Sequence, residues 1–577
     1  MKKVLLYDKL VKSVNFVNKN LILEEMLMKK KSKAALSLIL SLILLFSAVV
    51  PAFALTPSRT GSKVPVILIG GDGEQLVNKD GKPIPRWSSV FDRLTEKKDD
   101  EEGNKEIYKS VANVLLPFLI DGLLTGNYDR YYENFQKEVS ELFGDSLLDE
   151  NGEVANGSGL AQRRLTTMEN AMKYDAKSGK GYYGFYDYQF YYDWRLDPLE
   201  TADKLNEYIQ GVKKITGSPK VAIIGRCLGT VIATAYVAKY GTDDLYGLGL
   251  DGTVSNGAEI LSEPISGKFK LDGNAINRFL IDANYVNDLN VDAFIGETVE
   301  LLEKSGVLDV LTGVTKETIY YVVVKGVTSA LALSTFCTWP SFWAIVKEED
   351  YENAMDYVFG PQGSEKRKTY AGMIEKIEKY DTVVRKHLPE IMNKVNDNAN
   401  LAIFAKYGLQ INPIVQSRNV VGDQFASIKC SSFGATASDI YSTLSDEYVE
   451  NRVSEGKGKY ISPDKQIDAS TCMFPDQTWF IKGADHSFWT NIEHEVLYSA
   501  ITASSQLTVD DFDCTQFLVY NYETEVSSPM TEENCNTYYW KANKKSDEPD
   551  SKAGRLLSFL TMLFKWLKSL WEKIKNK

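Results

Sequence analysis

The sequence predicts an α/β fold, in which a mostly parallel sheet is covered by helices on both faces. Apolar runs typical of buried strands alternate along the chain with amphipathic helical segments. One of these runs, residues 220–224, passes into a helix through the tight turn Gly-x-Cys-x-Gly. The chain has 577 residues, of which 44% are hydrophobic, and this is ample for one large domain with insertions or for two domains.

The predicted strands are short runs of Val, Ile, Leu or aromatic residues bounded by glycine or polar residues. In chain order they are expected at 63–73, where the strand runs into a glycine loop, and at 220–224, 245–254, 401–407 and 478–482. Amphipathic spacing predicts a helix over 199–215, and a helix rich in small residues is predicted over 230–240.

A long insertion separates the early strands from the late ones. From about Leu271 to His387 the pattern is mostly helical, with Leu and Val at three-to-four spacing. We therefore expect the first part of the α/β core at 55–255, a mostly helical cap at 256–420 and the last part of the core at 421–543.

The N-terminal region resembles a secretory leader. A basic segment, Lys29 to Lys33, precedes an apolar stretch and then a small-x-small cleavage site before Leu55. We interpret 28–54 as a signal peptide and 1–27 as an over-extended start, with Met28 or Met26 as the true first residue. The protein is therefore expected to be secreted or to lie on the extracellular face of the membrane.

The C-terminal region is predicted to be separate from the core. Residues 544–554 are polar and read as a linker, and 555–577 form a strongly amphipathic helix with Leu and Trp on one face and Lys on the other. Two tryptophans and a lysine-rich polar face suit a membrane interface. Docking of this helix on the protein's own core is the alternative.

The net charge and the cysteine content limit which binding partners, metal ions and disulfides the protein can have. The chain carries −12, and because residues 1–54 carry nine Lys and three acidic residues, a mature chain would carry about −18. Such an acidic surface argues against a nucleic acid partner. No Cys/His metal spacing is present in the sequence, and no cofactor is expected. Export permits disulfides, and Cys514–Cys535 and Cys430–Cys472 are possible pairs that spacing alone cannot assign.

The Gly-x-Cys-x-Gly turn is the setting of a nucleophile elbow. The apex residue of such a turn has a strained backbone, so its neighbours at i−2 and i+2, here Gly225 and Gly229, must lack bulk. The apex residue is Cys227, and the helix N-terminus beneath it favours a thiolate. The alternative is a buried cysteine in an ordinary glycine turn. A histidine and an acidic residue in suitable positions would favour the nucleophile elbow.

The chain offers three histidines as the base. His486 follows the 478–482 strand and a glycine loop, where the base of such a nucleophile belongs. His494 is expected in the next helix as a structural residue, and His387 in a charged, solvated helix.

For the acid that orients the base, the turn-rich segment Ser462–Ser470 offers Asp464, with Asp468 as its competitor and Asp485 as a weaker one. The oxyanion hole needs two backbone N–H groups. One is expected from Leu228, and the other from Asp72 in the Gly70–Gly73 loop.

Three motifs together resemble the lecithin:cholesterol acyltransferase-like branch of the α/β-hydrolases. Residues 65–76 read Pro-Val-Ile-Leu-Ile-Gly-Gly-Asp-Gly-Glu-Gln-Leu, residues 192–196 read Tyr-Asp-Trp-Arg-Leu, and 225–229 keep the glycines of Gly-His-Ser-Met-Gly with Cys in place of Ser. The resemblance selects Asp464, because 464–468 is similar to the family's Asp-Gly-x-Val-Pro segment. It implies an α/β-hydrolase fold with a helical cap and an exported lipase or acyltransferase that acts on a lipid or other acyl ester.

In that interpretation Cys227 forms an acyl-thioester, which is passed to water, an alcohol or an amine. Polyhydroxyalkanoate synthases also resemble this chain, in their Gly-x-Cys-x-Gly elbow, but their acyl donors are cytosolic and the leader predicts export. The alternative from another class is a non-catalytic surface-binding protein on a decayed hydrolase fold.

Overall fold

The computed structural model describes residues 64–71, 76–84, 113–114, 117–122, 125–160, 187–276, 278–279, 316–521 and 526–535. The predicted leader, the linker and the C-terminal amphipathic helix lie outside these residues.

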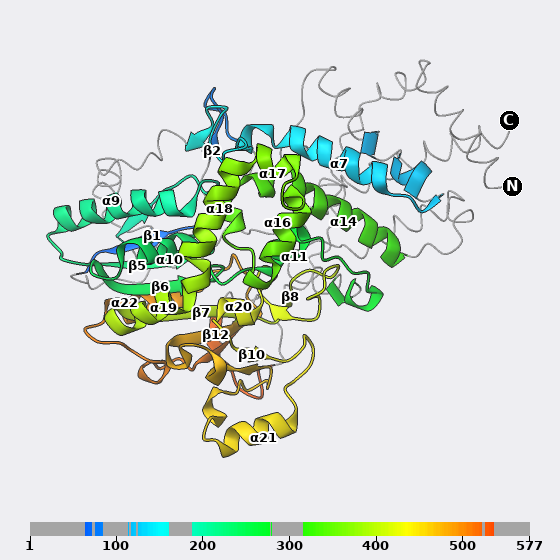
Figure 1. Cartoon of the computed structure of the whole chain (residues 1–577). Helices are drawn as coiled ribbons and strands as arrows, with labels where there is room; N and C mark the ends of the chain where they lie inside the picture. The colour runs from blue at the N-terminus through cyan, green and yellow to red at the C-terminus, as the bar shows by residue number, and fades with distance from the viewer. Residues whose placement is uncertain are drawn as a thin grey trace, which may run out of the picture.

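A central eight-stranded sheet organises the described chain (Figure 1). Its order is β14-β13-β12-β7-β6-β5-β1-β4, and every neighbouring pair is parallel except β13 and β14. The strands are β1 (Val66–Ile69), β4 (Tyr188–Phe190), β5 (Val221–Arg226), β6 (Leu245–Asp251), β7 (Asn400–Tyr407), β12 (Thr478–Lys482), β13 (Phe517–Asn521) and β14 (Val526–Pro529). The predicted α/β architecture with a mostly parallel sheet is confirmed.

Both faces of this sheet are buried, which is why its strands read as continuous apolar runs. In β5, Val221 and Ile223 face one core, and Ala222 and Ile224 face the other. Helices α9 (Pro198–Thr216), α10 (Leu228–Tyr240) and α19 (Leu388–Asn398) pack on the first face, and α22 (Asn491–Thr502) packs on the second.

Helix α9 shows how the sequence sets these elements. The Asp197 carboxylate accepts a hydrogen bond from the Leu199 backbone N–H at 2.9 Å, and Pro198 occupies the first turn, where its missing N–H costs nothing. Gly217 ends the helix in the left-handed conformation, at a φ of 70°.

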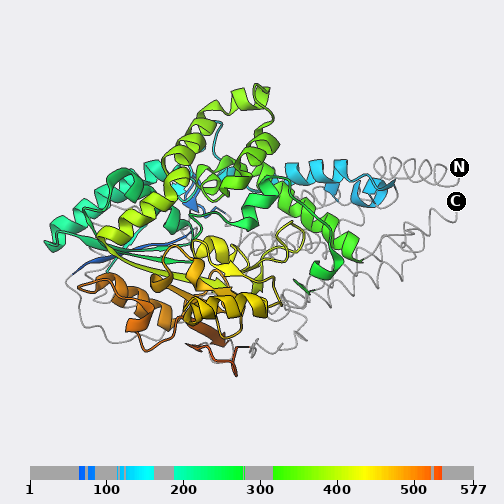
Figure 2. The same cartoon turned by 60° about the horizontal axis from the view of Figure 1, so that its bottom comes forward.

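A helical subregion lies to one side of the sheet (Figures 1 and 2). It contains α7 (Asp129–Leu142), α14 (Lys316–Ser334), α15 (Pro340–Trp343), α16 (Tyr351–Phe359), α17 (Glu365–Thr369) and α18 (Ala371–Val383). Part of it has its own apolar core, which includes Trp343, Met355 and Met373. Among the described residues one segment, Tyr320–Thr338, is long and apolar enough to cross a membrane, and it is mostly buried against the rest of the protein.

Strand β7 falls inside the range 256–420 that the sequence assigned to the cap. It pairs with β6 and β12 in the middle of the sheet, so the last part of the core includes residues from Asn400 onward. The remaining described elements are α11 (Glu259–Ile265), α20 (Ile428–Ser431), α21 (Asp446–Ser454), β2 (Leu76–Val77), β3 (Gly159–Leu160), β8 (Leu409–Gln410), β9 (Val421–Gly422), β10 (Thr436–Ala437) and β11 (Ile467–Asp468), together with short π and 3₁₀ turns.

All six cysteines are free thiols in the structure. Cys514 packs with the core on the α22 side of the sheet and Cys535 with the core on the opposite side, which separates them. Cys430 donates instead to Glu259 Oε1 at 3.5 Å. Neither of the two pairs considered from the sequence is joined.

Candidate active site

Cys227 occupies the sharp turn between β5 and α10, with a φ of 51° and a ψ of −124°. This is a strained conformation for a residue with a side chain. A Cβ on Gly229 would lie 2.0 Å from the Ile69 carbonyl oxygen, and one on Gly225 would lie 3.0 Å from the Gly229 oxygen. Gly229 therefore lets the turn pass close to β1, and Gly225 lets the strand pack against the first turn of α10, as the elbow interpretation requires.

The loop after β1 lies against the thiol. A Cβ on Gly71 would come within 3.0 Å of the Cys227 Cβ and 3.3 Å of its Sγ. The Tyr192 hydroxyl, from the Tyr-Asp-Trp-Arg-Leu motif, donates to the Gly70 carbonyl oxygen at 2.8 Å and thereby anchors this loop. Leu228 is the first residue of α10, where backbone N–H groups have no partner inside the helix, and Asp72 lies outside the described residues.

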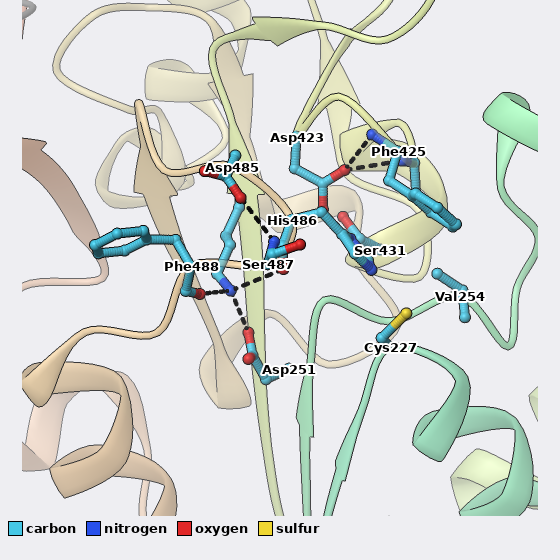
Figure 3. Close-up of polar contacts among 12 residues, drawn as sticks. Cys227, Asp251, Val254, Asp423, Phe425, Ser431, Asp485, His486, Ser487 and Phe488 are labelled. Atoms are coloured by element: carbon cyan, nitrogen blue, oxygen red, sulfur yellow. Dashed lines mark hydrogen bonds and ion pairs between the residues drawn. The ribbon is translucent and has the colours of Figure 1, made fainter. Parts of the chain in front are cut away.

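His486 lies in the loop that follows β12, and its partner is Asp423. The ring Nδ1 is 2.7 Å from Asp423 Oδ2, and the His486 backbone N–H donates to the Asp423 carbonyl oxygen at 2.9 Å. The Phe425 ring stacks on the imidazole, with 4.5 Å between ring centroids and a 20° angle between planes. Figure 3 shows His486 between Asp423 and Cys227 at this edge of the sheet.

The surroundings of His486 change the pKa of its imidazole. Burial disfavours the protonated ring, but the Asp423 carboxylate and the Cys227 sulfur outweigh it and raise the pKa of His486 to about 10. Among the described residues Nε2 has no hydrogen-bond partner that meets the usual geometric limits. With Nδ1 held by Asp423, Nε2 is the ring nitrogen left to act on the thiol.

Asp423 is held by its own turn, which leaves one oxygen for the histidine. Its Oδ1 accepts the backbone N–H of Phe425 at 3.0 Å (Figure 3). The same oxygen accepts the backbone N–H of Ala426 at 2.8 Å. Gln424, between them, takes a φ of 74°. Sequence reasoning missed Asp423, although it satisfies the chain order of nucleophile, acid and histidine.

Asp464, the acid predicted from the sequence, does not reach the site. Its Oδ2 lies 2.6 Å from Lys482 Nζ and accepts from the Tyr407 hydroxyl at 3.2 Å, while Oδ1 accepts from the Ser462 hydroxyl at 2.5 Å. Asp464 is buried in an ion pair, and Asp423 is the carboxylate that contacts His486.

The other residues considered also have separate partners. Asp468 pairs with Arg452 at 2.8 Å, and Asp485 accepts the Ser487 backbone N–H at 2.8 Å. His494 lies in α22, where its Nδ1 is 2.9 Å from the Thr490 carbonyl oxygen, and His387 is exposed. Neither histidine is the base at Cys227.

No family model, no curated protein and no solved structure matches the chain. Among the described residues no cluster of His, Cys, Asp and Glu is arranged to hold a metal ion. The arrangement at Cys227 offers a thiol at a helix N-terminus, an imidazole beside it and a carboxylate that holds the imidazole.

Proposed function

We propose that the protein is an α/β-hydrolase-type enzyme that transfers acyl groups through a thioester on Cys227. His486 is the acid and base, and Asp423 orients it. The observation that carries the proposal is the chain of contacts from Asp423 to His486 to Cys227 at a strained strand–helix turn. A cysteine in an ordinary glycine turn has no need of a histidine held by a buried carboxylate.

In the first half of the reaction the Cys227 thiolate attacks the carbonyl carbon of an acyl ester. The Leu228 backbone N–H donates a hydrogen bond to the developing oxyanion. A second backbone N–H, predicted to be that of Asp72, donates another. When the C–O bond breaks, His486 gives its Nε2 proton to the departing alcohol oxygen, and Cys227 retains the acyl group as a thioester.

In the second half water or an acceptor alcohol or amine attacks the thioester. Neutral His486 takes the proton of the attacking group, and the C–S bond breaks to release the thiolate beside the imidazolium. Asp423 keeps its charge throughout and holds Nδ1–H, so that Nε2 is always the nitrogen that exchanges the proton.

The resemblance to lecithin:cholesterol acyltransferase-like enzymes supports a lipid or other acyl ester as substrate. The leader predicted at 28–54 supports export, and the helix predicted at 555–577 supports contact with a membrane surface. The substrate, the export and the membrane contact all belong to the proposal. The segments 28–54 and 555–577 lie outside the described residues.

Cys227→Ala tests the proposal, because the side chain is small and the glycines already carry the turn. Hydrolysis of a p-nitrophenyl ester is expected to fall to background, and wild-type protein quenched during turnover is expected to carry one acyl group on the Cys227 peptide. Circular dichroism and the melting temperature report whether the variant remains folded. A Cys227→Ala rate equal to that of the wild type would instead favour the non-catalytic surface-binding protein.

A further inference from the structure

A buried cluster of charges lies directly behind the proposed site. At its centre is Lys406, the seventh residue of β7, whose side chain is 0% exposed. Its Nζ lies 2.9 Å from Asp251 Oδ1 and 3.2 Å from Glu493 Oε1. Asp251, with Glu493 as the smaller contributor, outweighs burial and raises the pKa of Lys406, while burial raises the pKa of Glu493 itself.

The same ammonium group holds the loop that carries the histidine. Lys406 Nζ lies 3.5 Å from the His486 carbonyl oxygen and also donates to the Phe488 carbonyl oxygen. Figure 3 shows Asp251, His486 and Phe488, which supply three of the oxygens around this ammonium group. Four oxygens therefore converge on one cation, and two of them belong to the backbone of the 485–490 loop.

Asp251 connects this cluster to the nucleophile. Its carboxylate accepts from Arg226 Nε at 3.0 Å, and its backbone oxygen accepts the Cys227 N–H at 3.1 Å. Arg226, which precedes Cys227, also donates to the Ser487 carbonyl oxygen and lies over the Trp489 ring at 4.6 Å. One hydrogen-bonded network thus joins the turn of Cys227 to the loop of His486.

We propose that Lys406 is a positioning residue that, with Asp251 and Arg226, fixes the His486 loop against the Cys227 turn so that the imidazole faces the sulfur. This inference rests on the proposed function for its kinetic consequences. The cost of burying an ammonium group supports it, because apolar packing fills a core at less cost, whereas a cation can hold several backbone oxygens in a fixed geometry.

A second buried lysine provides the matched control. Lys482, the last residue of the neighbouring strand β12, has a side chain 2% exposed and pairs with Asp464 at 2.6 Å. Substitution of either lysine by Met removes a buried cation from a central strand. Only Lys406 has its ion-pair partner in the network that reaches His486 and Cys227.

The test compares wild type, Lys406→Met, Lys406→Arg and Lys482→Met in two assays. The first is iodoacetamide alkylation of Cys227, followed by peptide mapping at about pH 6, where an unassisted thiol reacts slowly. Burial raises the pKa of the other five thiols, at Cys337, Cys430, Cys472, Cys514 and Cys535, which makes the assay selective. The second is kcat and KM on a soluble ester.

Lys406→Met is expected to slow alkylation and to lower kcat by about ten- to a hundredfold each, with KM within about twofold, because displacement of a catalytic group by about 1 Å has that effect. Lys406→Arg is expected to restore part of both rates. Lys482→Met is expected to leave both rates near wild type even though it lowers the melting temperature. Wild-type rates in Lys406→Met, or equal losses in Lys482→Met, would overturn the inference.

Should Lys406→Met fail to fold, Arg226→Met serves in its place, since that side chain is 21% exposed and lies at the edge of the network. It is expected to slow both rates in the same direction but less, and wild-type rates would overturn the inference. Absence of ester turnover in the wild type, with the alkylation contrast intact, would reject the proposed function while supporting the positioning role.

Discussion

Two aspartates are buried near the carboxyl ends of β7 and β12, and they differ in what faces them. Asp423 holds the imidazole of His486 at 2.7 Å, whereas Asp464 holds the ammonium group of Lys482 at 2.6 Å. Each also accepts hydrogen bonds from its own turn, Asp423 from backbone N–H groups and Asp464 from the Ser462 hydroxyl.

The two aspartates differ in function because their basic partners differ: Asp423 faces a histidine and Asp464 faces a lysine. Asp464 and Lys482 form an ion pair whose side chains are both buried, 2.6 Å apart. Histidine can give up and regain a proton in reach of that range, so Asp423 and His486 can take part in a reaction cycle. In the proposed mechanism the same chemical group therefore serves structure at Asp464 and chemistry at Asp423.

Substitution of the two aspartates in parallel gives the largest expected contrast. Asp423→Asn should lower kcat on a soluble ester by about 10³- to 10⁴-fold, because the imidazole loses the partner that fixes its tautomer and orientation. Asp464→Asn should leave kcat of the folded fraction within a few-fold of wild type. Steady-state kinetics on both purified variants measures this, and equal losses would return Asp464 to the site.

Stability should show the reverse order. Asp464→Asn leaves Lys482 buried without its counter-charge, and loss of one partner from such a pair costs about 3 to 5 kcal/mol of unfolding free energy. Lys482→Met together with Asp464→Asn should recover part of that loss, since no unpaired charge remains. Urea titration of the single and double variants checks the recovery, and a double variant no more stable than Asp464→Asn would contradict it.

The pH dependence separates the two pairs further. The pKa of His486 is raised from 6.5 to about 10, so its contribution to stability is fully present below about pH 6.5 and is lost as pH rises through about 10. Activity should decline over the same alkaline range, because the leaving group needs the imidazolium proton. In Asp423→Asn this alkaline limb should move to lower pH. A pH–rate profile of wild type and variant tests the shift, and an unmoved limb would assign it to another group.

Phe425 should give the smallest effect. Its ring stacks on the imidazole at 4.5 Å, and an aromatic face beside a cation contributes about 0.5 to 2 kcal/mol. Phe425→Ala should therefore reduce kcat by less than about thirtyfold and should leave Asp464 and Lys482 unaffected. Kinetics and melting temperature report the two effects, and a loss as large as that of Asp423→Asn would mean that Phe425 does more than cover the ring.

Features with a local cause were predictable from the sequence. The strand predicted at 478–482 has those bounds in the structure, and the helix predicted at 199–215 spans Pro198–Thr216. The elbow at Cys227 was found from two glycines at fixed spacing, because the steric requirement lies within five residues. His486 was found from the strand and glycine loop that precede it.

Asp423 was missed because its position depends on distant contacts. The irregular segment after β7 is placed by the His486 N–H on the Asp423 oxygen and by the Ser427 N–H on the Glu259 carboxylate at 2.8 Å. No residue pattern near Asp423 predicts these contacts. Asp464 attracted attention because it lies in a turn that is visible in the sequence, and the structure has that turn, but with Lys482 beside it.

The contact between Arg226 and the Ser487 carbonyl spans 261 residues of chain. An association of such long range must wait until both segments have been synthesised, and loop closure over that distance is slow. Before His486 and its loop dock, Cys227 sits in a growing polypeptide as an unassisted thiol. In the proposed mechanism Cys227 therefore gains its base only after the loop that follows β12 has docked.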